Sequence, residues 1–214
     1  MLNIPESSLV CVVDDDAMVR QSLGMLLETL GLACVTFPDC RSFLESNEMT
    51  QCECLILDVR MPGISGTVLQ DILSVRAAYL PIIFISGHGD IPLAVEAMRK
   101  GAVDFMQKPF NEQVLLDRVQ KAIALCRERL AAERRQQAFD SRLAGLTPRE
   151  RDVVDAILSG LPNKRIATQL NISIKTVEQH RGNAMHKLGA RSLADLFIQL
   201  GTPTKIEKTG LTPN

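Results

Sequence analysis

Short apolar runs that end in polar side chains constrain the fold of this chain more than any other feature. The runs and the side chains after them are Val10–Val13 before Asp14, Asp15 and Asp16, Cys54–Leu57 before Asp58, Ile82–Ile85 before Ser86, and Val103–Met106 before Lys108. Short apolar runs separated by helical stretches are typical of buried parallel strands. Ligands of an open α/β sheet bind just beyond the carboxyl ends of its strands. The pattern therefore predicts a sheet edge that gathers carboxylates, a hydroxyl and an ammonium, which suits a divalent cation and a phosphoryl group.

Strand and helix patterns alternate five times over residues 1–125. We expect strands over residues 9–14, 33–37, 54–58, 81–86 and 103–106, with helices over 17–30, 39–46, 66–76 and 91–100 and a fifth beginning near Asn111. Five βα units with right-handed crossovers predict an α/β domain with a doubly wound parallel sheet.

The helical pattern that starts at Glu112 continues to about Phe139 without Gly or Pro. Its second half, from Cys126, is highly polar, so we interpret residues 126–142 as a solvated helical linker. A short dimerisation coil is the alternative, but clear heptads are missing. Thr147, Pro148 and Glu150 then have the pattern of a capping box that begins a new helix.

A small all-α domain is expected over residues 143–201, with four helices at 149–159, 163–170, 173–188 and 192–200. Apolar side chains that can close its core are Val153, Ile157, Ile166, Leu170, Val177 and Leu188. Ser173 follows a short turn and can cap the third helix. Residues 202–214 contain two Pro, one Gly and few apolar side chains, which indicates a frayed tail.

The net charge of −1 hides an asymmetry between the two ends of the chain. Residues 1–125 contain 9 Lys and Arg against 16 Asp and Glu, a net charge of −7. Residues 143–214 contain 10 against 6, a net charge of +4, and the linker has a net charge of +2. The acidic part suits Mg²⁺ and the basic part suits nucleic acid.

Composition also bears on compartment and redox state. No apolar run approaches the roughly 20 residues that a membrane span needs, and the N-terminus has no basic stretch followed by an apolar core. We therefore expect a cytoplasmic protein that does not enter the membrane. The six cysteines show no CxxC spacing, so reduced, structural thiols are favoured over a metal site built from Cys52, Cys54 and His88.

The carboxylates suit Mg²⁺, which is usually held by one or two carboxylates, waters and phosphate oxygens. Asp15 and Asp58 are candidate direct ligands, Asp14 can act through water, and the backbone carbonyl of Arg60 can supply another oxygen. A carboxylate can also attack phosphorus and form an aspartyl-phosphate. The simpler role of an acid after a strand is that of a helix N-cap, and Asp16 fits it.

Two further residues complete the predicted chemistry. Lys108 can stabilise the charge that develops on the transferred phosphoryl group, and Ser86 can donate a hydrogen bond to it. The Lys108–Pro109 bond is a candidate cis peptide, which would direct the lysine side chain inward.

These residues lie in motifs that resemble the two-component receiver domain over residues 9–125. The motifs are Val12-Val-Asp-Asp-Asp16, Leu57-Asp-Val-Arg-Met-Pro-Gly-Ile-Ser-Gly66, Ser86-Gly-His-Gly-Asp90 and Phe105-Met-Gln-Lys-Pro-Phe110. The resemblance implies a flavodoxin-like fold and phosphorylation of Asp58 by a sensor histidine kinase. It also implies Asp14 and Asp15 at the Mg²⁺ site and Lys108 on the phosphoryl group.

Two switch residues follow from the same resemblance. Ser86 stands where many members have Thr, and it keeps the hydroxyl donor. Phe105 matches the aromatic switch residue, although ordinary core packing also explains an aromatic side chain there.

The basic domain has the pattern of a helix-turn-helix, whose second helix enters the major groove with its N-terminal residues on base edges. Side chains expected at the bases are Lys175, Thr176, Glu178, Gln179 and Arg181, and those expected at phosphates are Lys164, Arg165 and Lys187. From the pattern alone, a helical bundle with a solvated polar face is equally consistent.

Three motifs favour DNA binding because they resemble the LuxR-type helix-turn-helix over residues 143–200. They are Leu146-Thr-Pro-Arg-Glu-Arg-Asp-Val-Val154, Gly160-Leu-Pro-Asn-Lys-Arg-Ile-Ala167 and Ile174-Lys-Thr-Val-Glu-Gln-His-Arg181. With the receiver, they resemble a FixJ/NarL-type response regulator. In that family the last helix pairs two DNA-binding domains. Leu193, Leu196 and Leu200 are candidates for that face, unless they belong to the core.

The resemblance implies a transcription factor that is phosphorylated on Asp58, forms a homodimer and binds double-stranded promoter DNA. Receiver pairing is expected over residues 91–100 and 103–106, and RNA polymerase is a further partner left open. The receiver is expected to catalyse only its own phosphorylation and slow dephosphorylation. The rival hypotheses are a Mg²⁺-dependent phosphatase, disfavoured because Arg60 occupies the general-acid position, and a degenerate receiver that acts as a dimerisation scaffold.

Overall fold

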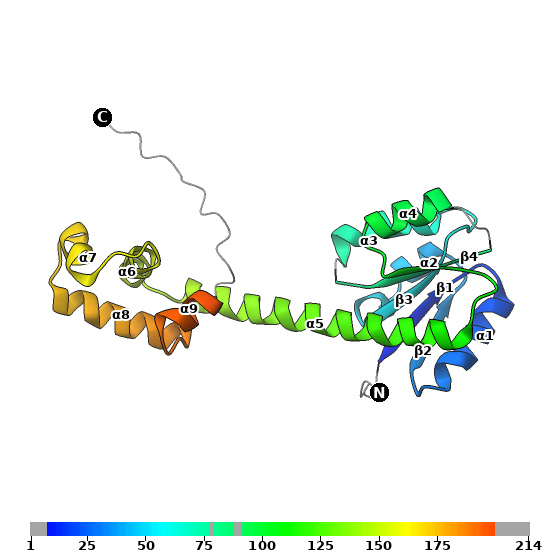
Figure 1. Cartoon of the computed structure of the whole chain (residues 1–214), viewed down its shortest axis with the longest axis horizontal. Coiled ribbons are helices and arrows are strands. Elements are labelled where there is room, and N and C mark those ends of the chain that lie inside the picture. The colour runs from blue at the N-terminus through cyan, green and yellow to red at the C-terminus, as the bar shows by residue number, and fades with distance from the viewer. Residues whose placement is uncertain (1–7, 78, 88–90, 200–214) are drawn as a thin grey trace. The chain divides into compact units, whose positions relative to one another are not determined.

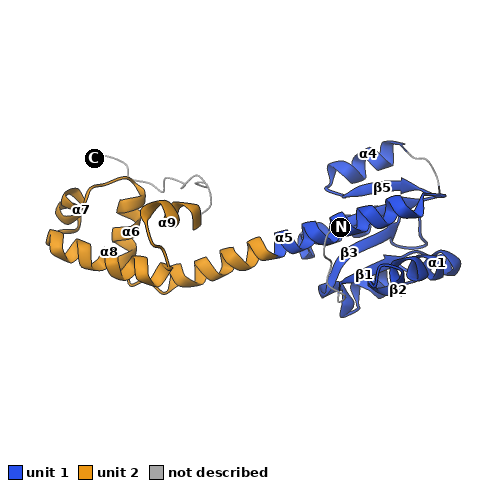
Figure 2. Cartoon of the chain, turned by 60° about the horizontal axis from the view of Figure 1, so that its bottom comes forward, with its two compact units in different colours: residues 1–130 blue, residues 131–214 orange. Residues whose placement is uncertain are grey.

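A computed structural model describes residues 8–77, 79–87 and 91–199 (Figure 1). Contacts divide the chain into two compact units, residues 1–130 and 131–214 (Figure 2). Within the described ranges, no helix is long and apolar enough to cross a membrane. The predicted tail, residues 202–214, and Leu200 lie outside the described residues.

The first unit contains a five-stranded parallel sheet in the order β2-β1-β3-β4-β5. The strands are β1 Leu9–Val13, β2 Ala33–Phe37, β3 Cys52–Asp58, β4 Ile82–Ser86 and β5 Asp104–Gln107. The helices are α1 Ala17–Glu28, α2 Cys40–Leu44, α3 Gly66–Arg76, α4 Ile91–Arg99 and α5 Glu112–Ala144, which continues into the second unit. The predicted doubly wound parallel sheet is confirmed.

Alternate residues of each strand enter opposite layers, because successive strand side chains point to opposite faces. Leu55, Leu57 and Phe84 pack in the layer that contains α2 and α3. Ile56 and Ile83 pack in the layer that contains α1 and the first part of α5. Burial on both faces explains why these strands are continuous apolar runs.

Apart from shifts at the ends of elements, such as α5 continuing to Ala144 rather than about Phe139, two local features differ from the expected elements. β3 begins at Cys52, two residues earlier than expected, with an irregularity in its register where it pairs with Leu9 and Val10 of β1. A short 3₁₀ helix, Glu48–Thr50, precedes it and was not predicted. It is a single turn of mostly polar residues, so it has no apolar periodicity from which to predict it.

The second unit consists of the end of α5 followed by α6 Pro148–Leu158, α7 Asn163–Leu170, α8 Ile174–Leu188 and α9 Leu193–Gln199. The predicted capping box is confirmed: Glu150 N donates to Thr147 Oγ1 at 3.3 Å, and Thr147 N donates to Glu150 Oε2 at 2.8 Å. Phe139 of α5 is buried in a core with Leu188 and Leu196.

The segment interpreted as a linker, residues 126–142, has buried residues near both ends. Cys126 is buried in the first unit, and Arg127 forms a bidentate ion pair with Glu53 through two 3.0 Å contacts. At the other end, Phe139 is 3% exposed. Residues 131–138 between them are all exposed. The solvated part is therefore shorter than the polar composition suggests.

Candidate functional site

Two buried carboxylates and one ammonium meet at the carboxyl edge of the sheet. Asp14 follows β1 and is 0% exposed, and Asp58 ends β3 and is 5% exposed. Lys108 Nζ lies 2.6 Å from Asp14 Oδ2 and 2.8 Å from Asp58 Oδ1. One cation thus bridges residues that lie 94 and 50 positions away in sequence. These two short distances confirm the prediction that the side chains of Asp14, Asp58 and Lys108 lie together at the sheet edge.

Burial and this bridge act on the pKa values in opposite directions. Burial raises the pKa of Asp14, and the hydrogen bonds from Lys108 and the Asp16 amide oppose it. Burial alone lowers the pKa of Lys108, but the hydrogen bonds to Asp14 and Asp58 outweigh it and leave that pKa raised. Lys108 is therefore a stable cation at the site. The Lys108–Pro109 bond is cis, as predicted.

The backbone around Asp58 fixes its second oxygen. Arg60 N donates to Asp58 Oδ2 at 2.8 Å. Gly66, the first residue of α3, lies so close that a Cβ there would collide with the carbonyl oxygen of Asp58. This role of Gly66 was not predicted from the sequence, because a close approach between two elements has no signal within either of them.

The two other acids after β1 have different roles. Asp15 is exposed. Asp16 Oδ1 accepts from Met18 N at 2.8 Å and caps α1, as its simpler interpretation predicted. Arg20, which sequence reasoning missed, donates to the carbonyl oxygens of Asp14 and Asp15 at 2.7 and 3.1 Å. Arg20 therefore holds the acidic loop in place from the first turns of α1.

Ser86 and Phe105 lie on the neighbouring strands. Ser86 ends β4 and is 1% exposed, and its carbonyl accepts from Lys108 N at 2.8 Å. Phe105 is half-buried, with its ring centroid 6.1 Å from that of Phe84. Its contact with the core supports the packing interpretation, and its switch role stays a prediction.

The donor set at this edge fits Mg²⁺. No group of three or more His, Cys, Asp or Glu side chains forms a metal site by itself within residues 8–77, 79–87 and 91–199. Mg²⁺ needs only one or two carboxylates when waters and phosphate oxygens complete its shell. Asp14 and Asp58 supply two buried carboxylates at one edge, which meets that requirement.

The cysteines are separate from this site. All six are free thiols. Burial raises the pKa of Cys34, Cys40 and Cys126 to about 11, and it raises the pKa of Cys52 and Cys54 as well. Thiols of this kind are poor nucleophiles. The alternative metal site involved His88, which lies outside the described residues.

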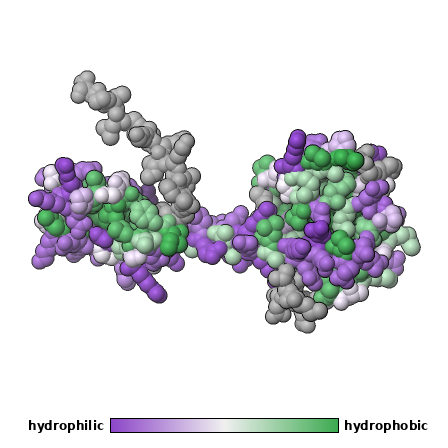
Figure 3. Space-filling model, viewed as in Figure 1, coloured by the Kyte–Doolittle hydropathy of each residue, from purple (hydrophilic) through white to green (hydrophobic). Residues whose placement is uncertain are grey.

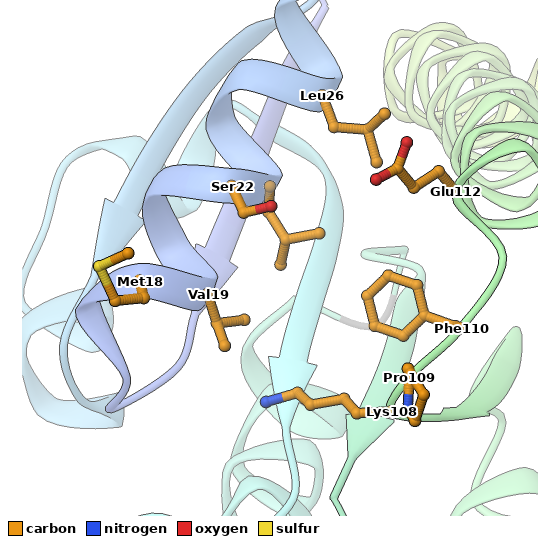
Figure 4. A pocket seen from close by; sticks show the side chains of 9 residues that line it. Met18, Val19, Ser22, Leu26, Lys108, Pro109, Phe110 and Glu112 are labelled. Atoms are coloured by element: carbon orange, nitrogen blue, oxygen red, sulfur yellow. The ribbon is translucent and has the colours of Figure 1, made fainter.

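An open cleft of about 420 Å³ borders Lys108 on the side of α1. Figure 4 shows Met18, Val19 and Leu26 of α1 on one wall, with Phe110 and Pro109 on the other. Met18 is 73% exposed. The cleft is therefore mostly apolar and accessible, and it lies beside the carboxylates.

The second unit presents a helix-turn-helix. α7 ends at Leu170, and its C-cap, Asn171, adopts the left-handed conformation with φ 52°. Ser173 caps α8 by accepting from Thr176 N at 3.1 Å. Val177 of α8 packs against Val153 and Ile166 in a small core. The predicted cap and turn are confirmed.

Most of the predicted DNA-contacting residues lie at the surface of α7 and α8. Those with exposed side chains are Lys164, Arg165, Lys175, Glu178, Gln179 and Lys187, and Thr176 and Arg181 are half-buried. Arg181 Nη1 lies 3.5 Å from Asn163 Oδ1 of α7. The exposed set provides cations and amide or carboxylate groups suited to a nucleic-acid surface.

The C-terminal end of α8 is attached to its own domain by two basic side chains. Lys187 Nζ donates to Glu150 Oε2 at 2.7 Å, and the Lys187 side chain is 40% exposed. Arg142 of α5 donates to the carbonyl of Leu188 at 3.3 Å. The hydrogen bonds from Lys187 and from the Thr147 amide lower the pKa of Glu150 from 4.5 to about 2. Sequence reasoning missed Arg142 and the second role of Glu150.

The apolar residues of α9 divide between core and surface. Leu196 is 1% exposed and Leu193 is half-buried, so both pack inward. Phe197 and Ile198 are instead 47% and 78% exposed. For the two leucines that the structure describes, the core interpretation is therefore the better one.

Comparison with known proteins assigns a family to each part of the chain. Residues 10–120 match the response regulator receiver domain family, and residues 144–200 match the LuxR family of bacterial regulatory proteins. The chain belongs to the response regulators. Receiver domains of this family typically bind Mg²⁺, and the two families together imply a kinase partner and DNA binding.

Similar proteins extend the likeness over most of this response regulator. The transcriptional regulatory protein FixJ of Azorhizobium caulinodans is 44% identical over 193 residues, 90% of this chain and 92% of FixJ. Nodulation protein W of Bradyrhizobium diazoefficiens is 45% identical over 190 residues, 89% of this chain and 84% of that protein.

Two solved structures support the same assignment. The structure of the response regulator StyR is 44% identical with a TM-score of 0.79, and it covers 90% of this chain and 98% of StyR. The structure of full-length FixJ from B. japonicum is 39% identical in sequence, with a TM-score of 0.54. The match covers 90% of this chain and 95% of FixJ. The chain is a transcriptional response regulator of a two-component system.

Proposed function

We propose that Asp58 is the phosphoacceptor of this response regulator and that its phosphate controls pairing on DNA. The observation that carries the proposal is the Lys108 ammonium, which contacts both buried carboxylates, Asp14 and Asp58. A nucleophilic carboxylate with a fixed cation beside it suits phosphoryl transfer, where charge develops on the transferred oxygens.

The proposed chemical step is the transfer of a phosphoryl group from the kinase to Asp58. A carboxylate oxygen of Asp58 attacks the phosphorus of a phosphohistidine on the sensor kinase, the P–N bond breaks, and the imidazole leaves. Asp14, Asp15, Asp58 and the Arg60 carbonyl would hold Mg²⁺, and the ion would neutralise charge on the phosphoryl oxygens. Lys108 contacts one of these oxygens, and Ser86 donates a hydrogen bond to another. Attack of water on the phosphorus later releases phosphate and restores the Asp58 carboxylate. In this proposal the receiver catalyses only its own phosphorylation and slow dephosphorylation.

The apolar cleft beside Lys108 supports a location for the kinase. The phosphohistidine must reach Asp58, and the cleft of Met18, Leu26 and Phe110 borders the same site. An exposed apolar surface of this kind suits a protein partner. We infer that the kinase contacts this side of the receiver.

The surface over α4 supports pairing of the receivers. Apolar side chains gather there (Figure 3), where Ile91, Val95 and Met98 are 74%, 46% and 43% exposed. The phosphoryl group carries roughly −1.5 to −2 charges at neutral pH, and it replaces the single negative charge of the Asp58 carboxylate. Ser86 then moves toward the phosphate, Phe105 rotates inward, and the surface of α4 and β5 changes so that two copies pair.

The DNA-binding unit then reads two half-sites. We assign Lys175, Thr176, Glu178, Gln179 and Arg181 of α8 to base edges, and Lys164 and Arg165 of α7 to phosphates. A C₂ dimer presents two such helices to half-sites about one helical turn apart, or a multiple of that distance. RNA polymerase as a partner of the bound dimer stays a prediction.

Replacement of the phosphoacceptor tests the proposal. In the wild-type protein, Mg²⁺ with beryllofluoride, which mimics a phosphoryl group, should produce dimers in sedimentation and tighter DNA binding. Asp58→Asn should abolish both responses, while the exposed Asp117→Asn serves as a matched control and keeps them. An Asp58→Asn protein that responds like the wild type contradicts the proposal.

Base reading has its own test. Glu178→Ala and Gln179→Ala should weaken binding to a duplex selected by the wild-type protein more than binding to its scrambled version. An equal loss on both duplexes contradicts contact with bases.

A further inference from the structure

Gly182 occupies the middle of α8, where the fold of its own domain does not require a glycine. Apart from its chain neighbours and the backbone of its own helix, a Cβ built at Gly182 meets no atom within 4 Å, so there is open space for a side chain. Its backbone lies within the regular helix Ile174–Leu188. By contrast, Gly189, which caps the same helix, has a φ of 69° that favours glycine.

A glycine inside a helix destabilises it relative to alanine, because its backbone loses more freedom on folding. Neither the backbone conformation of Gly182 nor the space around it requires a glycine there. A glycine allows the backbone to approach a ligand closely. The residues next to Gly182 on the helix surface indicate which ligand would approach it.

Residues three and four apart lie next to each other on a helix surface. Gly182 is therefore the neighbour of Gln179 and Glu178, both exposed. The buried side of α8 carries Val177 and Ala184 instead. Gly182 thus lies on the side that carries the proposed base-reading residues, one turn further along the helix.

We propose that Gly182 is a specificity-determining residue that lets the backbone of α8 approach base edges in the major groove. A methyl group there would hold the helix away from the bases and lengthen the hydrogen bonds of Glu178 and Gln179. Such bonds weaken as donor and acceptor separate. This proposal rests on the placement of α8 in the major groove.

The substitution Gly182→Ala separates stability from recognition, because the two should change in opposite directions. The full chain is tested with Mg²⁺ and beryllofluoride on a duplex selected by the wild-type protein from random double-stranded DNA. The melting temperature of the DNA-binding unit should rise by about 2–6 °C. Affinity for the selected duplex should fall about tenfold, roughly the effect of losing one base contact. Affinity for the scrambled duplex should fall much less.

Three comparisons make the result specific. Gly24→Ala in α1, where a Cβ also meets nothing within 4 Å, should raise stability without changing DNA affinity. Gly182→Leu should weaken binding to the selected duplex more than Gly182→Ala, because the obstruction is larger. Neither substitution at Gly182 removes a cation, so the salt dependence of binding should keep its slope.

Unchanged affinity of Gly182→Ala for the selected duplex overturns the proposal, and so does an equal loss on both duplexes. Gln179→Ala distinguishes the source of a failure. If it reduces the preference for the selected duplex while Gly182→Ala does not, only the role of Gly182 is wrong. If neither changes that preference, the placement of α8 in the groove is wrong, and the role of Gly182 is overturned with it.

Discussion

Gly66 begins α3 directly against the end of β3, where a side chain would collide with the carbonyl oxygen of Asp58. The amide of Arg60 holds the carboxylate of Asp58 from the same loop. The proposed phosphoacceptor is therefore positioned by backbone contacts as well as by Lys108. Small displacements of reacting groups have large effects on rate, so the role of Gly66 is open to a direct test.

Gly66→Ala should shift α3 away from β3 and disturb Asp58. We expect a loss of about 1–3 kcal/mol in the free energy of unfolding of the receiver, the usual result of overpacking, and slower phosphorylation by acetyl phosphate. Thermal unfolding and the phosphorylated fraction on phosphate-affinity gels measure the two effects. Gly24→Ala, which has open space around it, is the control. If Gly66→Ala had the stability and the phosphorylation rate of the wild type, α3 could shift away from β3 without affecting either, which would contradict the prediction.

Glu150 gives a pH-dependent prediction. Its pKa falls from 4.5 to about 2 in the folded protein, because Lys187 and the Thr147 amide hydrogen-bond to the carboxylate. A lowered folded-state pKa contributes stability above pH 4.5 and loses it as the pH falls toward 2. Glu150→Gln should abolish this contribution while it keeps the capping box, in which Gln can replace Glu. The difference in urea unfolding between the two proteins should therefore shrink between pH 5 and pH 2. A difference independent of pH would contradict the assigned cause.

The proposed recognition helix α8 is held at its C-terminal end, and its N-terminal half carries exposed side chains. Lys187 attaches the last turn to α6, and Arg142 attaches it to α5. Cations near a helix C-terminus also interact favourably with its partial negative charge. Sequence reasoning placed Lys187 at a phosphate. Its 2.7 Å contact with the buried Glu150 favours a structural role.

The salt dependence of DNA binding distinguishes these two roles. A lysine at a phosphate releases counterions, so Lys164→Ala should reduce the slope of log affinity against log salt by about 1. Lys187→Ala should weaken binding with little change in slope, because it loosens α8 without removing a phosphate contact. Titrations of one duplex at several salt concentrations measure both. A reduction of about 1 for Lys187→Ala would restore its role at a phosphate.

Elements with a strong local pattern were predictable from the sequence. The apolar runs ending at Asp58 and Ser86 predicted their strands, and Thr147 with Glu150 predicted the start of α6. Contacts between distant elements were not predictable, because Gly66 against Asp58 or Lys187 against Glu150 depends on how helices and strands pack. The burial of Phe139 was missed for the same reason: a polar stretch of α5 conceals one side chain that belongs to the next core.

Each unit of the chain has its own core, and α5 contributes to both. Leu115, Val119 and Ile123 of α5 are buried in the receiver, and Phe139 is buried in the DNA-binding unit. If the proposed phosphorylation acts by pairing the receivers, the second DNA-binding unit of a dimer binds as an intramolecular event, at high effective concentration.

This mechanism predicts that the gain in affinity on activation depends on the number and spacing of half-sites in the DNA. With Mg²⁺ and beryllofluoride, affinity for a duplex with two half-sites should rise by at least about 100-fold, while affinity for a single half-site should hardly change. Inserting about 5 base pairs between the half-sites should remove the gain, and inserting about 10 should restore much of it, because the half-sites then face the same side again. Titrations of these four duplexes measure the effect. An equal rise on the single half-site would mean that the unphosphorylated receiver masks its own DNA-binding unit, and pairing would no longer be the main source of affinity.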